Sequence, residues 1–209
     1  MRINIILGIF IALSLILCPI AALGGSEETA EHIVETADEE EKYISVMSPL
    51  TGRINRVDMR EYIVGCVAAE MPATYHSEAL RAQAVASYTY AKKIVEQNKN
   101  RKKSPFDADI TDSPDTHQGY IDKKARKEKW GDKYEEYEEK IGSAVDSVFG
   151  SYMKYEGETV LAVYHSISAG STQSAKNLWG EEIPYLQSVE SPGDKLSPDY
   201  LNKAFFEEK

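Results

Sequence analysis

The chain has 209 residues, and its 24 Lys and Arg against 34 Asp and Glu give a formal net charge of −10 at pH 7. This charge argues against general adhesion to nucleic acid or to an anionic membrane surface, so we expect no nucleic-acid partner. Cysteine occurs only at Cys18, in the apolar N-terminal segment, and at Cys66. The domain that follows this segment therefore has no internal disulfide and depends on its hydrophobic core.

Residues 1–26 are predicted to be a membrane anchor or a signal segment. No charged side chain occurs between Ile3 and Ser26, and this length suffices to cross a bilayer core, which takes about 20 residues. Arg2 precedes the apolar run and Glu27 follows it, a polarity that places the rest of the chain on the extracytoplasmic side of the cell membrane. Small residues at the end of the run leave open a cleaved signal peptide instead of a retained single-pass anchor.

An acidic linker and a β-hairpin come next. Residues 27–42 are mostly acidic or small and show no apolar periodicity, which is typical of a solvated linker. Tyr43–Met47 and Arg53–Val57 are short β-prone runs on either side of Ser48–Gly52, which is rich in turn residues. We therefore expect a domain over residues 43–209 that begins with a hairpin.

A first helix is predicted to begin at Met59. Asp58 and Glu61 have the spacing of a capping box, in which each side chain accepts a hydrogen bond from the backbone of the other. Pro72 disfavours helical geometry in the residue before it, so the helix should end near Glu70.

Glu70 has an unusual place in this helix. It follows Ile63, Cys66 and Val67 at the spacing of one helical face, so a carboxylate takes the last position of an apolar stripe. Both the negative C-terminal end of the helix dipole and partial burial would favour a protonated carboxyl there.

A second helix is predicted over residues 77–97, with Ser77 as its N-cap and an apolar face that packs against the first helix. This face consists of Leu80, Ala84, Tyr88 and Ala91. The basic run Asn98–Lys103 and the turn residues of Asp107–Asp115 then indicate an exposed loop that borders a groove.

A third helix and a second hairpin complete the pattern. Apolar residues at helical spacing run from Tyr134 and stop at Gly150. Ser151–Tyr155 and Thr159–Tyr164 then read as strands joined at Glu156–Gly157. The fold class is therefore predicted to be α+β, with paired helices packed against short antiparallel strands.

Glu70 is the candidate catalytic residue. Glycoside cleavage normally uses two carboxyls, whereas a lytic transglycosylase needs one, because the sugar's own 6-hydroxyl attacks the anomeric carbon. The same carboxyl first donates and then accepts a proton, which requires an acid that is protonated near neutral pH. The alternative from the residues alone is a structural carboxylate paired with a basic group such as Arg81.

A polar loop and two aromatic residues after the second hairpin indicate a sugar-binding groove. Hydroxyl and imidazole groups can hydrogen-bond a sugar, and aromatic faces can stack on its ring. The equally open alternative is that the loop is a turn and that the aromatic residues belong to the core. The residues concerned are His165, Ser166, Ser168, Thr172, Trp179 and Tyr185.

Cys66, His76 and His117 are chemically able to bind zinc. Their spacing matches no closed zinc site, and a small thiol within an apolar stripe is ordinary core packing. We therefore expect neither a metal nor another cofactor.

Several motifs together resemble the stage II sporulation protein D family. They occur in the family's order and cover about residues 43–194. The motifs are YIVGCVAAEMP (Tyr62–Pro72), SEALRAQAVA (Ser77–Ala86), DITDSPDTHQGY (Asp109–Tyr120), YHSISAGSTQ (Tyr164–Gln173) and PYLQSVESPGD (Pro184–Asp194).

This resemblance implies a lytic transglycosylase with Glu70 as its catalytic acid. Such an enzyme cleaves between N-acetylmuramic acid and N-acetylglucosamine in peptide-stripped glycan strands, leaving 1,6-anhydro ends, during engulfment of the forespore. The implied partners are a cell-wall amidase and a membrane protein that recruits both. The alternative is a glycan-binding module that enhances an amidase without cutting.

Three features depart from the family pattern. Tyr88 replaces a common arginine, and Gln173 replaces a second acid with an amide that can bind sugar but cannot titrate. We count both among the expected substrate contacts. The chain also ends at Lys209, before the family's glycine- and histidine-rich motif, so we expect a C-terminally truncated domain.

Overall fold

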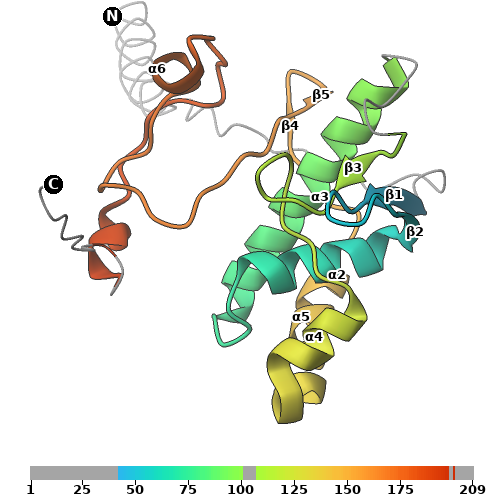
Figure 1. Ribbon diagram of the computed structural model, residues 1–209. Helices are drawn as coiled ribbons and strands as arrows, with labels where there is room; N and C mark the ends of the chain where they lie inside the picture. Colours follow the sequence, from blue (N-terminus) through green and yellow to red (C-terminus); the bar gives the residue numbers. More distant parts are fainter. Residues whose placement is uncertain (1–41, 101–106, 198–199, 201–209) are drawn as a thin grey trace, which may run out of the picture. The chain divides into compact units, whose positions relative to one another are not determined.

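The described chain begins with a hairpin and continues with helices (Figure 1). The computed structural model describes residues 42–100, 107–197 and 200. The expected membrane segment (1–26) and nearly all of the acidic linker (27–42) lie outside these residues. No helix within the described part of the chain is long and apolar enough to cross a membrane. Its mixture of helices and short strands confirms the α+β class.

The predicted first hairpin is confirmed. Strand β1 (Tyr43–Met47) pairs antiparallel with strand β2 (Ile54–Asp58). The turn closes through a hydrogen bond of 2.9 Å from the N–H of Ser48 to the carbonyl of Arg53, and Gly52 takes a positive φ of 67°. Glycine suits this position because a side chain would strain the backbone there.

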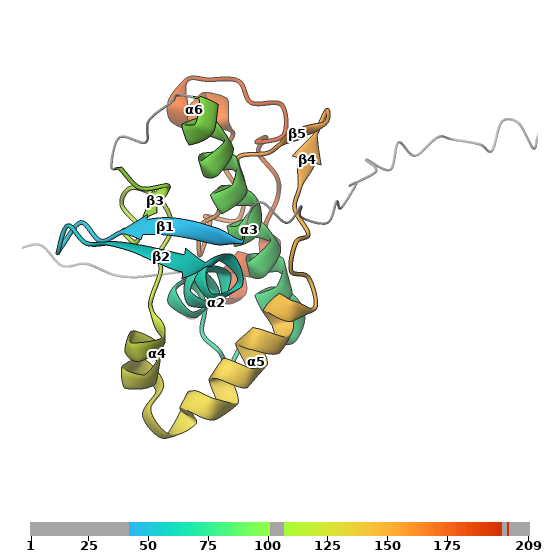
Figure 2. The same cartoon turned by 90° about the vertical axis from the view of Figure 1, so that its right-hand side faces the viewer.

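A third strand adds to the hairpin from far along the chain. Strand β3 (Ile110–Thr111) runs parallel to β1, giving the order β2-β1-β3 (Figure 2). Its two side chains are buried, and the Asp109 carboxylate accepts a hydrogen bond of 2.8 Å from the N–H of Ser45. The expectation of an exposed loop over Asp107–Asp115 is therefore wrong at its centre, because Ile110 and Thr111 are buried and pair with β1.

Helix α2 (Met59–Glu70) begins and ends where the sequence predicts. Asp58 is its N-cap and accepts a hydrogen bond from the N–H of Glu61 at 3.3 Å. The reciprocal half of the capping box is absent among the described contacts, because the Glu61 carboxylate instead accepts from Arg126 at 2.6 Å.

Helix α3 (Ser77–Asn100) starts one residue after its capping side chain. Nδ1 of His76 accepts a hydrogen bond from the N–H of Glu78 at 3.2 Å, so His76 rather than Ser77 supplies the cap. The predicted apolar face of α3 is buried, as expected for a helix that packs against α2. That face consists of Leu80, Ala84, Tyr88 and Ala91.

Two helices lie between β3 and the second hairpin, and the sequence predicts one of them. Helix α4 (Lys123–Trp130) is unpredicted and connects through the 3-10 turn η2 (Gly131–Lys133) to α5 (Tyr134–Asp146). Helix α5 is the predicted third helix, but it ends at Asp146 and the chain then turns to Gly150, which has φ 83°.

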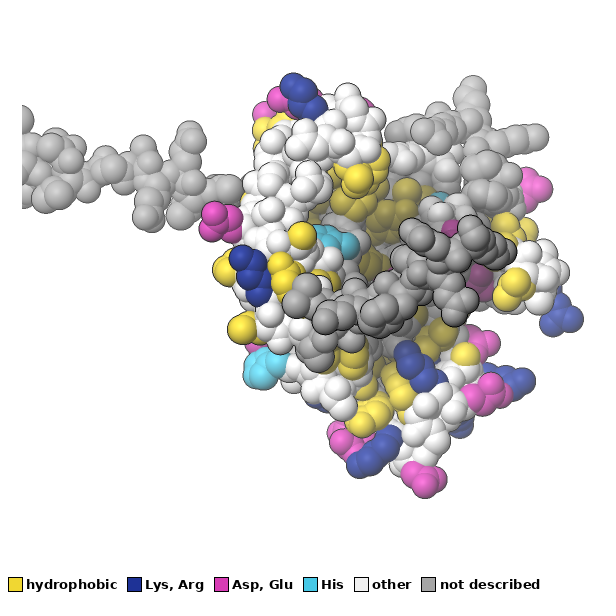
Figure 3. All heavy atoms as spheres, turned by 60° about the vertical axis from the view of Figure 1, so that its left-hand side comes forward, with side chains coloured by type: hydrophobic (Ala, Val, Ile, Leu, Met, Phe, Trp, Pro, Cys, Tyr) yellow, Lys and Arg dark blue, Asp and Glu magenta, His cyan; other side chains and the backbone are white. Residues whose placement is uncertain are grey.

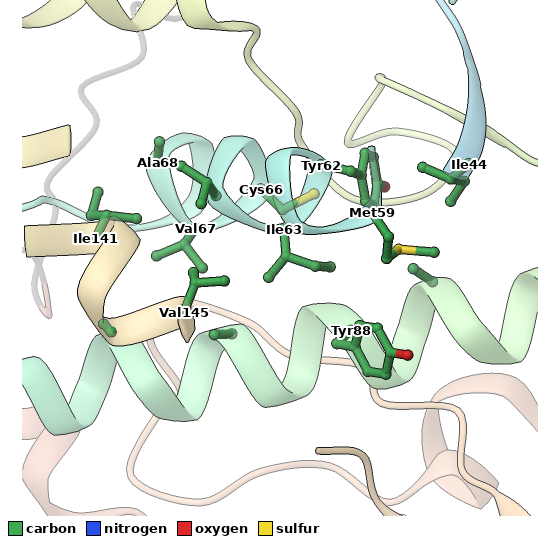
Figure 4. Packing of buried hydrophobic residues seen from close by; sticks show 14 of the residues in the cluster. Ile44, Met59, Tyr62, Ile63, Cys66, Val67, Ala68, Tyr88, Ile141 and Val145 are labelled. Carbon is green, nitrogen blue, oxygen red and sulfur yellow. The ribbon is translucent and has the colours of Figure 1, made fainter. Parts of the chain in front are cut away.

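The core lies where α2, α3 and α5 meet. Figure 4 shows Ile63 and Val67 of α2 pointing toward α3, with Ile141 and Val145 of α5 closing one end. All four are fully buried or nearly so. Each such aliphatic side chain stabilises the fold by about 1.5–3 kcal/mol.

Arg126 of α4 joins three parts of the fold. Its side chain has no exposed surface, and it donates hydrogen bonds to Glu61 of α2 at 2.6 Å and to Glu138 of α5 at 2.8 Å. A further bond of 3.0 Å reaches the carbonyl of Ile121. The guanidinium therefore fixes α4 to both neighbouring helices.

The second hairpin is confirmed, although its strands are short. Strand β4 (Lys154–Tyr155) pairs with β5 (Glu158–Thr159) around Glu156–Gly157, both of which have positive φ. Residues 165–197, here called the C-terminal arm, then fold back on themselves around α6 (Ala175–Trp179).

Backbone hydrogen bonds within the arm hold its outgoing and returning segments together. Thr172 donates to Val189 at 2.8 Å, and Ala175 donates to Leu186 at 2.9 Å. The arm ends with the 3-10 turn η3 (Pro192–Leu196).

Arg126→Ala is expected to lower the free energy of unfolding by about 3–5 kcal/mol, because it leaves two carboxylates partly buried without their shared cation. Urea denaturation of the purified chain measures this change. The matched control is Arg60→Ala, which removes an exposed ion pair with Asp146 and should cost at most about 1 kcal/mol. Equal losses in the two variants would contradict a special role of Arg126.

Candidate active site

Glu70 is the last residue of α2, and its side chain is exposed. The next residue, Met71, has an extended backbone, and its N–H closes the final helical turn on the carbonyl of Val67 at 3.0 Å. The prediction that α2 ends at Glu70 is confirmed. The expectation of a partly buried carboxyl is wrong, because the apolar stripe ends one turn before this side chain.

A segment from Gln118 to Ile121 lies along α2 and holds the Glu70 carboxylate. The N–H of Gly119 donates a hydrogen bond of 2.6 Å to Oε1 of Glu70. The N–H of Ile121 reaches the carbonyl of Gly65 at 3.3 Å. A backbone donor therefore orients the carboxylate.

Two glycines allow this close approach. A Cβ on Gly65 would lie 2.4 Å from the ring of Tyr120, and a Cβ on Gly119 would lie 2.9 Å from Oε1 of Glu70. Because Gly65 has no side chain, the Tyr120 ring also stacks on Tyr62 with centroids 5.2 Å apart. Backbone space, rather than side-chain chemistry, thus sets the position of the segment.

The predicted alternative pairing of Glu70 with Arg81 is wrong. Arg81 forms an ion pair of 2.6 Å with Glu78, one helical turn away on α3. Lys129 lies near the end of α2 and donates to the carbonyl of Ala68 at 2.8 Å. It therefore satisfies the helix end and not the Glu70 carboxylate.

Glu70 opens into a cavity of about 500 Å³. Among the described residues that line it, Glu70 is the sole acid, and two histidines and three tyrosines surround it. We call this cavity the Glu70 groove. Its lining consists of Glu70, Met71, Pro72, Tyr75, Gln83, Tyr90, Pro114, His117, Gln118, Ala162, Val163, Tyr164, His165 and Ser166.

A second cavity of about 670 Å³ adjoins the Glu70 groove, because Val163, Tyr164 and His165 line both. The C-terminal arm forms most of its wall. We call it the arm cavity. Figure 3 shows a hollowed face on which hydrophobic side chains gather beside histidine.

The predicted sugar contacts divide between these two cavities. His165 and Ser166 line the Glu70 groove, and both are exposed. The other predicted residues that line the arm cavity are Ser168, Thr172, Gln173, Trp179 and Tyr185. Trp179 is 50% exposed, so the alternative that it is a core residue is wrong.

The hydroxyl groups of Ser168 and Thr172 have partners within the arm. Ser168 donates to the carboxylate of Asp194, and Thr172 accepts from the N–H of Val189 at 2.9 Å. The pKa of the Asp194 carboxyl lies below its ordinary value because it accepts hydrogen bonds from Ser168. These two hydroxyls therefore fold the arm, which supports the turn alternative for both.

Tyr88 does not line either cavity. Its side chain is 2% exposed, and its ring lies 5.7 Å from that of Phe149 and 6.4 Å from that of Tyr152. The expectation that Tyr88 contacts substrate is therefore wrong, because position 88 lies on the core face of α3. Gln83 and Tyr90 occupy the face of α3 that lines the Glu70 groove.

The three possible zinc ligands lie in different environments. Cys66 is buried in the core, where burial raises the pKa of its thiol. His76 caps α3, and His117 accepts a hydrogen bond on Nδ1 from the N–H of Thr111 at 3.2 Å. Within the described ranges, no three His, Cys, Asp or Glu side chains form a metal-binding group.

Sequence reasoning did not assign roles to Gln118, Gly119 or Tyr164. Gly119 contacts Glu70 through its backbone N–H, and Gln118 forms hydrogen bonds through its side-chain amide. Neither residue has a titratable side chain that would mark it as a candidate in the sequence. The only available signal was their occurrence within the motifs at Asp109–Tyr120 and Tyr164–Gln173.

Comparison with known proteins gives a consistent family match. Residues 49–155 match the sequence model of the family described as stage II sporulation protein. The chain is 35% identical to stage II sporulation protein D of Bacillus subtilis over 175 residues, which cover 84% of this chain and 50% of that protein. The equivalent Bacillus amyloliquefaciens protein is 36% identical over 148 residues, covering 71% and 42%.

A more distant match concerns the amidase enhancer of Bacillus subtilis. It is 27% identical over 122 residues, which cover 58% of this chain and 14% of that protein. The chain spans about half the length of the curated sporulation relatives it matches.

The imidazole of His117 is expected to titrate below 6.5, because burial lowers its pKa in the folded chain. An unfolded histidine titrates near 6.5, so the unfolded state binds the proton first and the folded chain loses stability as the pH falls below about 6.5. NMR titration of the imidazole resonances measures the pKa. His117→Gln should remove this part of the pH dependence, and a midpoint at or above 6.5 would contradict the prediction.

Proposed function

Because the chain belongs to the stage II sporulation protein D family, we propose that it acts on the cell wall in sporulation, as a lytic transglycosylase with Glu70 as catalytic acid. The observation that carries this proposal is that Glu70 is the one carboxyl among the described residues that line the Glu70 groove. A hydrolase of the common kind needs a second carboxyl across the scissile bond.

One carboxyl suffices for the proposed reaction. Glu70 gives its proton to the oxygen that links C1 of N-acetylmuramic acid to C4 of N-acetylglucosamine, and the bond from C1 to this oxygen breaks. The 6-hydroxyl oxygen of the same N-acetylmuramic acid bonds to C1 and releases its proton to the Glu70 carboxylate. The products are a free 4-hydroxyl and a 1,6-anhydro end, with no water consumed.

The surroundings of Glu70 support this role in two ways. The N–H of Gly119 holds Oε1 at 2.6 Å, and within the described chain no hydrogen bond reaches Oε2, which is therefore available to a ligand. A glycan strand in the groove would cover this exposed carboxyl and bring its glycosidic oxygen within reach of Oε2.

The proposal also covers the substrate of the domain and its location in the cell. The groove and the arm cavity together present tyrosine, tryptophan, amide and hydroxyl groups, which suit the faces and acetamido groups of a peptide-stripped glycan strand. We place the domain outside the cytoplasm, tethered by residues 1–26. A cell-wall amidase and a recruiting membrane protein would be its partners in the engulfment of the forespore.

A second candidate function is enhancement of an amidase without glycan cleavage. The match to an amidase enhancer favours it, as does the amide at Gln173 in place of an acid of the family pattern. In this case the Glu70 groove would bind glycan and Glu70 would contribute a hydrogen-bond acceptor only.

Glu70→Gln should lower the rate of cleavage of peptide-free glycan strands by about 100-fold or more, since general acid–base catalysis contributes roughly 10²–10⁴. Mass spectrometry of soluble products from the purified full chain counts the 1,6-anhydro ends. Glu128→Gln makes the same chemical change on the exposed face of α4 and should leave the rate unchanged.

Absence of products from a wild-type chain that melts cooperatively would exclude cleavage by this chain. Stimulation of a purified cell-wall amidase by that same chain would then support the second candidate. Equal cleavage by wild type and Glu70→Gln would remove Glu70 from the mechanism.

A further inference from the structure

Gln118 lies at the centre of a buried hydrogen-bond network beside the Glu70 groove. Its side chain is 3% exposed. Its Nε2 donates to the hydroxyl of Tyr62 at 3.1 Å and to the carbonyl of Ser87 at 3.2 Å, and its Oε1 accepts from the hydroxyl of Tyr164 at 3.0 Å. The amide therefore connects α2, α3 and the segment that leads into the C-terminal arm.

These partners leave the amide one orientation. The carbonyl of Ser87 can only accept, so it must face the NH₂ group of Gln118. The oxygen of the amide then faces Tyr164. Because the Gln118 amide is buried, loss of a partner leaves one of its polar atoms without a hydrogen bond.

The peptide group that follows Gln118 is the one that contacts Glu70. Gly119 follows directly, and its N–H holds Oε1 of Glu70 at 2.6 Å. The fit is tight, since even a Cβ on Gly119 would come within 2.9 Å of that oxygen. A small rotation of the chain at Gln118 would thus move or break the hydrogen bond to the carboxylate.

Tyr164 brings the cavities into the same network. Its ring lines both the Glu70 groove and the arm cavity. Burial, followed by the nearby negative charge of Glu70, raises the pKa of its phenol well above the ordinary value. The side chain that would border a ligand in either cavity is therefore also the one that donates a hydrogen bond to Gln118.

We propose that Gln118 and Tyr164 are positioning residues for Glu70: the hydrogen bond from Tyr164 to Gln118 fixes the Gly119 N–H against Oε1 of the carboxylate and leaves Oε2 for the ligand. This inference rests on the proposed function for its catalytic consequence. Its geometric part, the link from Tyr164 to Gly119, holds independently of any activity.

The geometric part is tested by NMR on the full chain with ¹⁵N-labelled glycine. The Gly119 amide is identified by its loss in Gly119→Ala, and its proton should resonate far downfield because it bonds to a carboxylate. Tyr164→Phe and Gln118→Met should both move this proton upfield. Tyr137→Phe changes a tyrosine that packs on Trp130 outside the network and should leave the resonance in place. An unchanged Gly119 amide in Tyr164→Phe would overturn the inference.

The catalytic part is tested by the kinetics of glycan cleavage. Tyr164→Phe should lower kcat by about 10- to 100-fold, as expected for a misplaced catalytic group, while KM stays near wild type and the variant still melts cooperatively. Tyr164→Phe removes one hydroxyl only, so it keeps the test decisive if Gln118→Met fails to fold. A raised KM with unchanged kcat would overturn the positioning role and make Tyr164 a ligand contact.

The two possible failures are distinguishable. If the wild-type chain cleaves no glycan, the proposed function fails, and the Gly119 resonance still decides whether Tyr164 and Gln118 orient the carboxylate. If the wild type cleaves glycan and Tyr164→Phe does so equally fast, only the positioning role fails.

Discussion

The close approach of the Gln118–Ile121 segment to helix α2 is the contact on which the site depends. Glycine at position 65 lets the Tyr120 ring reach the helix backbone, and Ile121 bonds to the carbonyl of Gly65. From this docked position the segment delivers the Gly119 N–H to Glu70. Arg126 holds the following helix, α4, against α2 and α5, so the segment is anchored on both sides. The orientation of the carboxylate thus follows from backbone packing.

Some of the polar residues after β5 line the Glu70 groove, and others form hydrogen bonds that fold the C-terminal arm. His165 and Ser166 face the Glu70 groove, whereas Ser168 and Thr172 bond within the C-terminal arm. The arm thereby keeps its own fold and still presents Trp179 to the cavity beside the groove. Tyr164 stands between the two regions, because it lines both cavities and bonds to Gln118. One side chain therefore contacts both cavities and the segment that holds the Glu70 carboxylate.

Much of the fold and one residue of the site follow from the sequence. The first hairpin, α2, α3 and Glu70 at the helix end were predictable, because turn residues, caps and apolar periodicity act locally. Helix α4 was not, since its one buried side chain is Arg126 and no apolar stripe marks it. Strand β3 depends on a distant partner, and Gly119 acts through its backbone N–H. Burial at positions 70 and 88 depends on tertiary packing, which spacing along one helix does not determine.

Gly65 and Gly119, which allow the Gln118–Ile121 segment to lie close to α2, also make the site sensitive to point mutation. Every single-base change of a glycine codon that alters the amino acid introduces a Cβ or a stop. At Gly65 that atom meets the Tyr120 ring, and at Gly119 it meets the Glu70 carboxylate. No one-step substitution is therefore conservative at either position. Variation among descendants of this gene should therefore accumulate on exposed helix faces rather than at these two codons.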